Sequence, residues 1–502
     1  MEIRHIIVQA GGKGTRLEHL TRNKPKALVS IDNLPMIFHL FRRFPEARFH
    51  VIGDYKYHVL DRYLEAFADD VSYDLVDARG TAGTCGGLGE ALKRVPEDEP
   101  FLLIWSDLIL PGTFEVPEKE ADYIGISKGF RCRWKYEGGK LEEEPSLEYG
   151  VAGLFIFRNK KDLWDVPEKG EFVRWLQGKG LDFDELPLHK TKEVGLLSEY
   201  EELPVEKCRP FNRIYIDGDY IIKEGIDEQG QALAIRERAW YEKVRESRPE
   251  LIPQIVSLDP LKMERIQGQN IYEYDSLSKD AKKEILEKII HSLREIHQIG
   301  EAPGDWDSCE EAYIGKTLKR LEKVRKLIPF ADQPTINING RVCRNVFFHQ
   351  EKLASAIRAY YPEKFVFLHG DCTFSNMMLR ETDASPVLID PRGYFGHTEF
   401  YGDPAYDWGK LYYSVVGDYD RFNLGEFQLE ILEDEVRLQI ESNCWKDMED
   451  DFFQLLEGEA DARQIRLIHG IIWLSLTTYA WDNYDAVCGA FYNGTYYLEE
   501  AL

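Results

Sequence analysis

The sequence predicts two successive α/β domains: a doubly wound, largely parallel sheet over residues 1–205, and a two-lobed α+β domain over residues 206–502. Three observations support this division. The chain has 502 residues, which is too long for one ordinary domain. Residues 1 to about 200 alternate apolar, strand-like runs with helical patterns, whereas the pattern from about residue 276 is mostly helical. A polar, proline-containing segment at 196–211 separates the two parts.

The first domain contains short apolar runs that alternate with helical spacing. The runs predict strands at residues 5–10, 48–55, 101–110 and 150–157. The helical spacing predicts helices at 57–68 and 86–95. In a doubly wound sheet, ligands bind beyond the carboxyl ends of the strands. We therefore expect a binding site where Gly11–Arg16 and Asp107 follow their strands.

The second domain begins with a predicted hairpin, in which two alternating strands surround Asp217-Gly218. A helix is expected next, at residues 231–247, and then further strands between 251 and 274. This order predicts a small mixed lobe at about 206–268, followed by a mostly helical lobe at about 269–502.

Composition excludes several classes of partner. The formal charge of -26 argues against nucleic acid or an anionic membrane as the main partner. No two of the eight cysteines form a CxxC pair, so neither a zinc site nor a disulfide framework is indicated. No apolar stretch reaches membrane-spanning length. We expect a cytoplasmic enzyme that acts on small molecules. The sequence leaves open whether it forms an oligomer.

Four elements in the first domain have the chemistry of a nucleotide site. Glycines leave backbone amides free to approach a phosphate, and Arg16 and Lys26 can neutralise its charge. The first element is a loop formed by Gly11, Gly12, Gly14, Thr15 and Arg16. The others are Lys24-Pro25-Lys26, the run of Gly80, Thr81, Ala82 and Gly83, and Asp107 at the end of a strand.

Together these elements resemble the sugar-phosphate nucleotidyltransferases, which have a Rossmann-like fold. The resemblance implies that a sugar-1-phosphate oxygen attacks the α-phosphate of a nucleoside triphosphate, CTP or UTP, and that pyrophosphate leaves. It implies that Arg16 grips the triphosphate, that Lys26 stabilises charge at the α-phosphate, and that the 80–83 run lies along the base or sugar. Asp107 would hold Mg²⁺, with Glu193 in place of the family's second metal-binding Asp. Glu144 stands where the family often has Lys near the acceptor.

A second chemical motif lies in the helical lobe. Two apolar runs, Phe365–Leu368 and Val387–Ile389, are expected to be the only strands there, and each delivers an acid at its end. Asp371 and Asp390 are these acids, and Asn376 lies five residues after Asp371. Such a group can hold a magnesium nucleotide and take a proton from an attacking hydroxyl.

The motif resembles the catalytic loop of the aminoglycoside phosphotransferase and choline kinase family, which has a protein-kinase-like fold. The resemblance implies ATP and Mg²⁺ or Mn²⁺, with Asp371 as base and Asn376 and Asp390 as metal ligands. Lys223 would reach the α- and β-phosphates and Glu237 would pair with it. Residues 262–266 would form the hinge against the adenine.

Other polar residues near this motif receive structural roles. We interpret His369 as a packed residue and Asp407 as a support for the catalytic loop. Arg392 would either contact an anionic group of the substrate or form a salt bridge with a neighbouring acid, and we favour the salt bridge. For most of the C-terminal aromatic residues, helical spacing favours core packing over a substrate wall. These are Trp473, Tyr479, Trp481, Tyr484, Phe491 and Tyr492.

The leading interpretation is a bifunctional enzyme. One domain would phosphorylate a small hydroxyl substrate, a sugar in the favoured version, and the other would couple the phosphate to a nucleotide. The product would serve surface polysaccharide or capsule biosynthesis. The alternative is a choline or amino-alcohol kinase fused to a CTP:phosphocholine-type cytidylyltransferase, for which Glu144 could favour a cationic head group. A nucleotide-binding regulator with one inactive site is a third interpretation, which the intact motifs disfavour.

Overall fold

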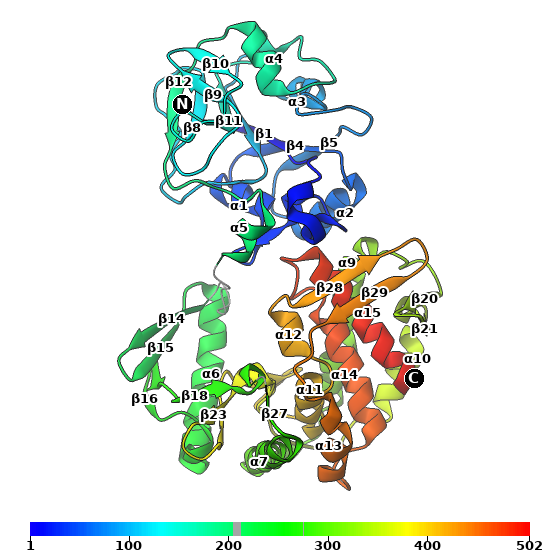
Figure 1. Cartoon of the computed structure of the whole chain (residues 1–502). Coiled ribbons are helices and arrows are strands. Elements are labelled where there is room, and N and C mark those ends of the chain that lie inside the picture. The colour runs from blue at the N-terminus through cyan, green and yellow to red at the C-terminus, as the bar shows by residue number, and fades with distance from the viewer. Residues whose placement is uncertain (204–211, 275) are drawn as a thin grey trace. The chain divides into compact units, whose positions relative to one another are not determined.

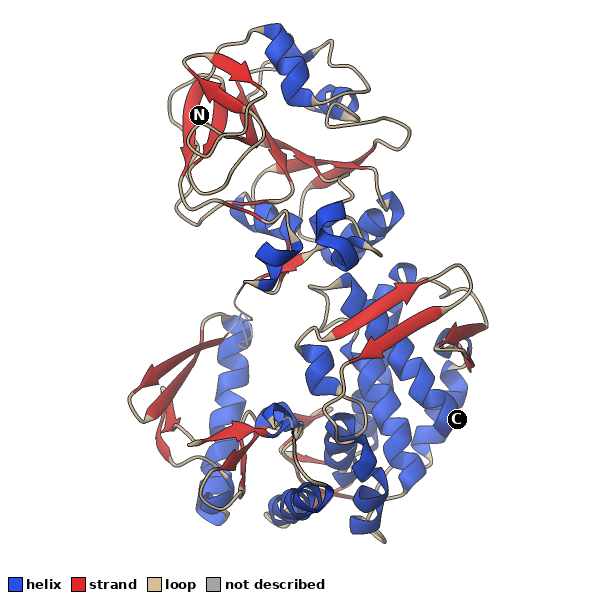
Figure 2. Cartoon of the chain, viewed as in Figure 1, coloured by secondary structure: helices blue, strands red, loops and turns tan. Residues whose placement is uncertain are grey.

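The computed structural model describes residues 1–203, 212–274 and 276–502 (Figures 1 and 2). Its contacts divide the chain into two compact units that separate between residues 204 and 205, with residues 481–485 grouped with the first unit. Most of the predicted boundary segment, 204–211, lies outside the described residues. The boundary at 205 and the lobe limits therefore stay predictions.

The first unit is built on a seven-stranded sheet in the order β12-β8-β11-β6-β1-β4-β5. Its strands are β1 (His5–Gln9), β4 (Arg48–Gly53), β5 (Tyr73–Asp77), β6 (Phe101–Trp105), β8 (Tyr123–Ser127), β11 (Val151–Phe157) and β12 (Asp184–Leu188). Only β11 runs antiparallel to its neighbours, β6 and β8. The remaining neighbours are parallel, so the predicted largely parallel sheet is confirmed.

Helices cover both faces of this sheet, as expected of a doubly wound fold (Figure 1). On one face lie α1 (Met36–Arg43) and α2 (Tyr57–Phe67), and on the other lie α3 (Leu88–Arg94) and α4 (Phe172–Lys179). Leu88 and Leu92 of α3 and Phe172 and Leu176 of α4 are buried in one apolar cluster with the sheet. The loops at the carboxyl ends of β1 and β6 are thereby held on a rigid frame.

The second unit begins with an antiparallel sheet in the order β14-β15-β17-β16. Its strands are β14 (Asn212–Asp217), β15 (Tyr220–Gly225), β16 (Ile255–Leu258) and β17 (Leu261–Glu264). The predicted hairpin is present, with Asp217 opposite Tyr220 and Gly218 at a φ of 61°, which favours glycine. Helix α6 (Glu228–Ser247) packs against β15. Asp227 caps its N-terminus, and the Asp227 side chain accepts a hydrogen bond from the Gly230 amide at 2.7 Å.

The rest of this unit is mainly helical. Its longer helices are α7 (Lys279–His297), α9 (Lys316–Val324), α10 (Gln350–Arg358), α11 (Pro404–Val415), α14 (Ala462–Leu476) and α15 (Tyr484–Ala501). Strands β22 (Lys364–Phe367), β23 (Met377–Arg380) and β24 (Pro386–Leu388) frame the predicted catalytic motif. No helix in the described ranges combines the length and apolar content needed to cross a membrane.

The prediction that only the catalytic strands interrupt this lobe is wrong. A four-stranded sheet in the order β21-β20-β29-β28 is also present. It consists of β20 (Thr335–Ile338), β21 (Arg341–Arg344), β28 (Phe427–Ile431) and β29 (Val436–Ile440). Apolar and polar residues alternate in β28 and β29, which is the period of a half-buried strand. The helical pattern of the flanking segments concealed this signal.

Candidate active sites

The glycine loop of the first unit follows β1 and is tightly packed. Gly14 has a φ of 63°, a conformation that L side chains rarely adopt. A Cβ atom at Gly11 would lie 2.8 Å from the Cβ of Asp54, so no larger residue fits there without movement. The amide of Lys26 donates to the carbonyl of Gly12 at 3.3 Å, which joins the glycine loop to the lysine loop. Thr15 begins the 3₁₀ helix Thr15–Thr21.

Four of the predicted residues gather beside this loop. The Nζ of Lys26 lies 2.5 Å from an Oδ of Asp107. Strand β13 (Lys192–Glu193) pairs with β7 (Leu108–Ile109), which places Glu193 opposite Leu108, the residue after Asp107. A guanidinium nitrogen of Arg16 lies 4.0 Å from an Oε of Glu193. Tertiary pairing thus brings Glu193 to residues more than 80 positions earlier.

The electrostatics of this cluster suit a bound cation. Burial, and then the charge of Asp107, raise the pKa of Glu193 above its ordinary value. Two carboxylates held near one another are relieved by a divalent ion, and oxygen ligands are those that Mg²⁺ prefers. The described residues contain no group of three or more His, Cys, Asp or Glu side chains arranged for a metal. The protein would thus supply two ligands to a metal ion, Asp107 and Glu193, and phosphate oxygens and water would complete its coordination shell.

The 80–83 run contacts residues 168–170, and the adjacent Thr84 joins it to the end of β1. The side-chain amide of Gln9, the last residue of β1, donates to the carbonyl of Thr84 at 2.6 Å. Gly83 has a φ of 76°, and its Cβ would lie 2.3 Å from the carbonyl oxygen of Gly170. The exposed Glu144 carboxylate lies 3.0 Å from Lys135. Lys135 also contacts Glu137 and Glu142, so this surface keeps a net negative charge, and the link between Glu144 and a cationic acceptor stays a prediction.

In the second unit, Lys223 joins two of the predicted acids. Its Nζ lies 2.9 Å from an Oε of Glu237 in α6 and 2.5 Å from an Oδ of Asp390. Burial lowers the pKa of Lys223, but the charges of Asp390 and Glu237 outweigh burial and raise it. Burial also raises the pKa of Glu237 to about 7. In the predicted hinge, Glu264 pairs with Arg380 of β23 at 2.6 Å.

The predicted base and metal ligands meet at one turn. The side-chain Nδ2 of Asn376 donates a hydrogen bond to the backbone carbonyl of Asp371 at 2.8 Å and another to the Asp371 carboxylate at 3.1 Å. The amide of Ile389 donates to the carbonyl of Asn376 at 3.0 Å, which places Asp390 beside it. This leaves the side-chain oxygen of Asn376 and the carboxylate of Asp390 as oxygen donors, a set that fits Mg²⁺.

The loop that carries Asp371 is fixed from below by Asp407. The carboxylate of Asp407 accepts hydrogen bonds from the amides of His369 at 3.0 Å and Gly370 at 2.7 Å. His369 is fully buried, and its Nε2 lies 3.0 Å from the carbonyl of Ile389. Both residues therefore hold the loop, in line with the structural roles we expected for them.

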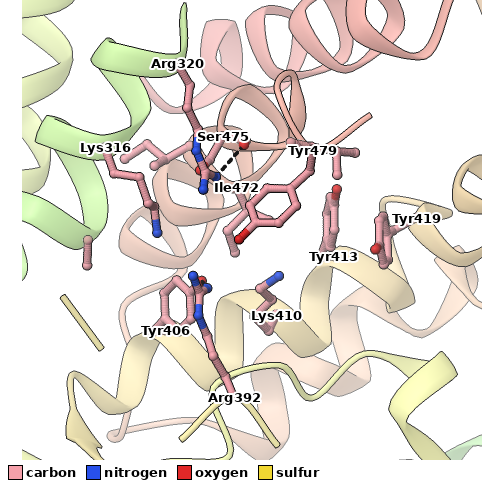
Figure 3. A pocket seen from close by; sticks show the side chains of 13 residues that line it. Lys316, Arg320, Arg392, Tyr406, Lys410, Tyr413, Tyr419, Ile472, Ser475 and Tyr479 are labelled. Carbon is pink, nitrogen blue, oxygen red and sulfur yellow. Dashed lines mark hydrogen bonds between the residues drawn. The ribbon is translucent and has the colours of Figure 1, made fainter. Parts of the chain in front are cut away.

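A pocket adjoins Asp371 in the helical lobe (Figure 3). The Nζ of Lys410 lines it and lies 2.8 Å from the carboxylate of Asp371. The salt bridge expected for Arg392 is not formed in the described part of the chain. Its guanidinium instead donates to the hydroxyls of Tyr406 and Tyr394, at 2.8 Å each. Lys316 and Arg320 of α9 complete the charged lining.

Of the six C-terminal aromatic residues, four lie in the core, one lines the pocket, and Trp481 is half-buried in the turn between α14 and α15. Trp473, Tyr484, Phe491 and Tyr492 are buried, as core packing predicts. Tyr479 instead lines the pocket, with the Arg320 guanidinium 4.4 Å from its ring centre.

Three cations of the pocket, Lys316, Arg320 and Lys410, were not predicted from the sequence. Lys410 lies three residues after Asp407 in α11, so one helical turn brings it to the same face. Lys316 and Arg320 are four apart in α9 and also share a face. These spacings were readable, but nothing in the sequence indicated which cavity the two faces would meet.

Comparison with known proteins matches each unit to an enzyme family. Residues 217–439 match the phosphotransferase enzyme family, and residues 6–114 match the MobA-like NTP transferase domain. Mannose-1-phosphate guanylyltransferase catalytic subunit beta of Dictyostelium discoideum is 29% identical over 151 residues, which cover 29% of this chain and 40% of the relative. UTP--glucose-1-phosphate uridylyltransferase AglF of Haloferax volcanii is 32% identical over 170 residues, which cover 33% of this chain and 65% of the relative.

The chain thus spans less than two thirds of the length of either curated relative. Among solved structures, the inositol-1-phosphate CTP transferase from T. maritima is similar to 39% of this chain and 91% of its own. That similarity has a TM-score of 0.33 and 18% sequence identity.

Proposed function

The chain carries an N-terminal MobA-like NTP transferase domain and a C-terminal phosphotransferase domain, and we propose that it is a bifunctional enzyme making a nucleotide-activated compound. The phosphotransferase domain phosphorylates a small hydroxyl substrate, a sugar, with ATP. The NTP transferase domain then couples that phosphate to a nucleoside triphosphate, CTP or UTP, and releases pyrophosphate. The enzyme acts in the cytoplasm, and its activated product is a precursor for surface polysaccharide.

The kinase step in this proposal centres on Asp371. Its carboxylate orients the acceptor hydroxyl and takes the proton as the oxygen bonds to the γ-phosphorus and ADP leaves. Lys223, fixed by Glu237, contacts the α- and β-phosphates. Asn376 and Asp390 would hold the metal ion, which neutralises charge between the phosphates when bound. The geometry that supports these roles is the Lys223 contact with both Glu237 and Asp390.

The transfer step uses charge and position rather than a proton relay. The acceptor phosphate oxygen attacks the α-phosphorus, and the bond to pyrophosphate breaks. Arg16 holds the triphosphate, and Lys26 offsets the negative charge that develops at the α-phosphate. Asp107 and Glu193 would hold the metal. The gathering of these four side chains beside the glycine loop supports this assignment.

The observation that carries the proposal is that two complete phosphate-handling constellations occur in one chain. A regulator with one inactive site would tolerate the loss of Lys26–Asp107 or of Asp371–Asn376, yet both contacts are formed. The two curated relatives act on mannose-1-phosphate and glucose-1-phosphate by name, which supports a sugar phosphate as the compound passed to the first domain.

Separate loss of the two activities tests the proposal. Asp371→Ala should abolish ATP-dependent phosphorylation and leave nucleotide transfer onto a supplied phosphorylated acceptor intact. Asp107→Ala should do the reverse. Mass spectrometry of a pool of sugars and amino alcohols, incubated with ATP and the four nucleoside triphosphates, would report both products.

The matched control is Asp383→Ala, at an exposed acid beyond β23, which should change neither activity. Circular dichroism and thermal unfolding would show that each variant is folded. If both site variants remained folded and each lost both activities, the two-site proposal would be wrong.

A further inference from the structure

The pocket beside Asp371 is lined by four cationic side chains and no carboxylate. Lys316 and Arg320 come from α9, Arg392 follows β24, and Lys410 comes from α11. Figure 3 shows all four charged ends directed into the same space. This concentration of positive charge occurs in a chain in which 89 acidic residues outnumber 63 basic ones. The charge of the pocket is therefore opposite in sign to the net charge of the protein.

Of these four cations, only Lys410 has a carboxylate partner within 4.0 Å in the described structure, and that partner is Asp371. Arg320 donates to the backbone carbonyl and hydroxyl of Ser475, at 2.7 Å each. Arg392 is held by tyrosine hydroxyls. These neutral partners fix the direction of the guanidinium groups but leave their charge uncompensated.

Two further features of the pocket suit the binding of an anionic ligand. The Tyr413 side chain is 1% exposed, and its hydroxyl has no hydrogen-bond partner among the described residues. A buried hydroxyl without a partner costs free energy unless a ligand or water satisfies it. Burial, and then the charges of Arg392, Arg320 and Lys410, lower the pKa of Lys316 well below its ordinary value. The cations thus repel one another, and an anion would relieve the repulsion.

We infer that the acceptor of the kinase domain carries an anionic group, a carboxylate or a phosphate, in addition to the hydroxyl that is phosphorylated. The inference rests on the proposed kinase function and narrows its substrate. The anionic group lies among Lys316, Arg320 and Arg392, and the hydroxyl faces Asp371 on the side of Lys410. Phosphorylation forms the bond from hydroxyl oxygen to γ-phosphorus, breaks the bond to ADP, and passes the proton to Asp371. A quaternary amine such as choline would meet like charge there.

The geometry explains how one pocket could order both ends of such a substrate. Lys410 contacts the carboxylate of Asp371. Arg392 lies two residues after Asp390 and packs against the Asp371 loop, since a Cβ at Gly370 would lie 2.9 Å from the Cβ of Arg392. An anion bound by these cations is therefore set a fixed distance from the base. Such positioning contributes to rate by replacing a bimolecular encounter with a bound geometry.

The first test offers the full chain a matched set of acceptors with ATP: glucose, glucuronate, glucose 6-phosphate and choline, followed by a wider pool of neutral, anionic and cationic hydroxyl compounds. Phosphorylated products are identified by mass spectrometry, with Asp371→Asn as the blank. Products from carboxylate- or phosphate-bearing compounds alone would support the inference and reveal which anion is used. A neutral or cationic compound phosphorylated as efficiently would overturn it while leaving the kinase proposal standing.

The second test measures binding and does not depend on turnover. Calorimetric titration of glucuronate and inorganic phosphate should show binding to the wild-type chain, weakened about 10- to 100-fold in Arg320→Met and in Lys316→Met, because each loses a charged hydrogen bond or ion contact. Lys319→Met, at an exposed position on the same helix, is the matched control and should bind normally.

The two tests separate the possible failures. Pocket-dependent anion binding without Asp371-dependent phosphorylation of any acceptor would overturn the proposed kinase function and keep the anion site. Anion binding that is absent, or that Arg320→Met and Lys316→Met leave unchanged, would overturn the inference whatever the kinase assay shows.

Discussion

The candidate site of the first unit pairs its charges, whereas the pocket of the second unit leaves most of its charges uncompensated. In the first, Lys26 lies against Asp107, and Arg16 lies 4.0 Å from Glu193. In the second, three of the four cations have no carboxylate within 4.0 Å in the described ranges, and Lys410 alone contacts an acid.

The difference indicates what each site still needs. Two cations balanced by two carboxylates can receive a phosphate together with its metal ion, since the added charges then nearly cancel. A pocket of four cations can receive an anion without a metal. Under the functions proposed above, the first site would receive a metal–triphosphate, and the pocket of the second unit would receive the charged end of a small acceptor.

The largest expected effect comes from breaking the pair in the first unit. Lys26→Met should lower the rate of nucleotide transfer by roughly 100- to 1000-fold, because a preorganised charge at the α-phosphate is lost. Kinase activity should not change. Steady-state assays of both steps would measure this, with Lys26→Arg expected to recover part of the transfer rate because it keeps the charge.

Lys26 is 8% exposed, so its removal leaves Asp107 without its buried partner. Thermal unfolding of Lys26→Met would therefore accompany the kinetics. A folded variant with a normal transfer rate would show that this ion pair is structural, and the contrast between the two sites would lose its functional meaning.

A smaller effect is expected at the other acid of the same site. Glu193→Gln keeps the shape but removes one anionic ligand, so transfer should fall by roughly 100-fold and require more Mg²⁺. If Glu193 were only a solvated acid, the change would be less than about twofold. Transfer rates across a magnesium titration would distinguish these, with the exposed Glu185→Gln as control. An unchanged magnesium dependence would leave Asp107 as the only carboxylate ligand assigned there.

The smallest effect concerns the pH dependence of the second unit. The groups that face Lys316 are Arg320, Arg392, Lys410 and Glu311, and the net effect of burial and these charges is a lowered pKa. A lysine with a lowered pKa is charged below that pKa and loses its charge as the pH rises through it. The KM for an anionic acceptor should therefore rise severalfold toward alkaline pH.

Lys316→Arg tests this directly, because arginine stays charged throughout the accessible range. The rise in KM should flatten in this variant, while kcat at neutral pH should change little. A pH profile of KM identical to that of the wild-type chain would show that Lys316 does not bind the acceptor as a cation.

Much of the fold was predictable because its signals are local. The alternation of apolar runs predicted β1, β4, β6 and β11, and the Asp217-Gly218 turn predicted the hairpin, since neighbouring residues decide backbone conformation in such segments. The sheet of β20, β21, β28 and β29 was missed because its two hairpins lie some 90 residues apart in a helical region. Each was too short to outweigh the surrounding pattern.

The sequence by itself determined the chemistry-bearing motifs and their order: the glycine loop with Lys26 and Asp107, and the turn with Asp371, Asn376 and Asp390. Their spacing is short or follows strand ends, so local rules fixed it. The resemblance implied that Glu237 pairs with Lys223, and this contact is formed. Only the tertiary structure decided that Lys316, Arg320, Arg392 and Lys410 share one pocket. These residues come from separate helices and loops, and their meeting depends on how whole elements pack, which no local pattern encodes.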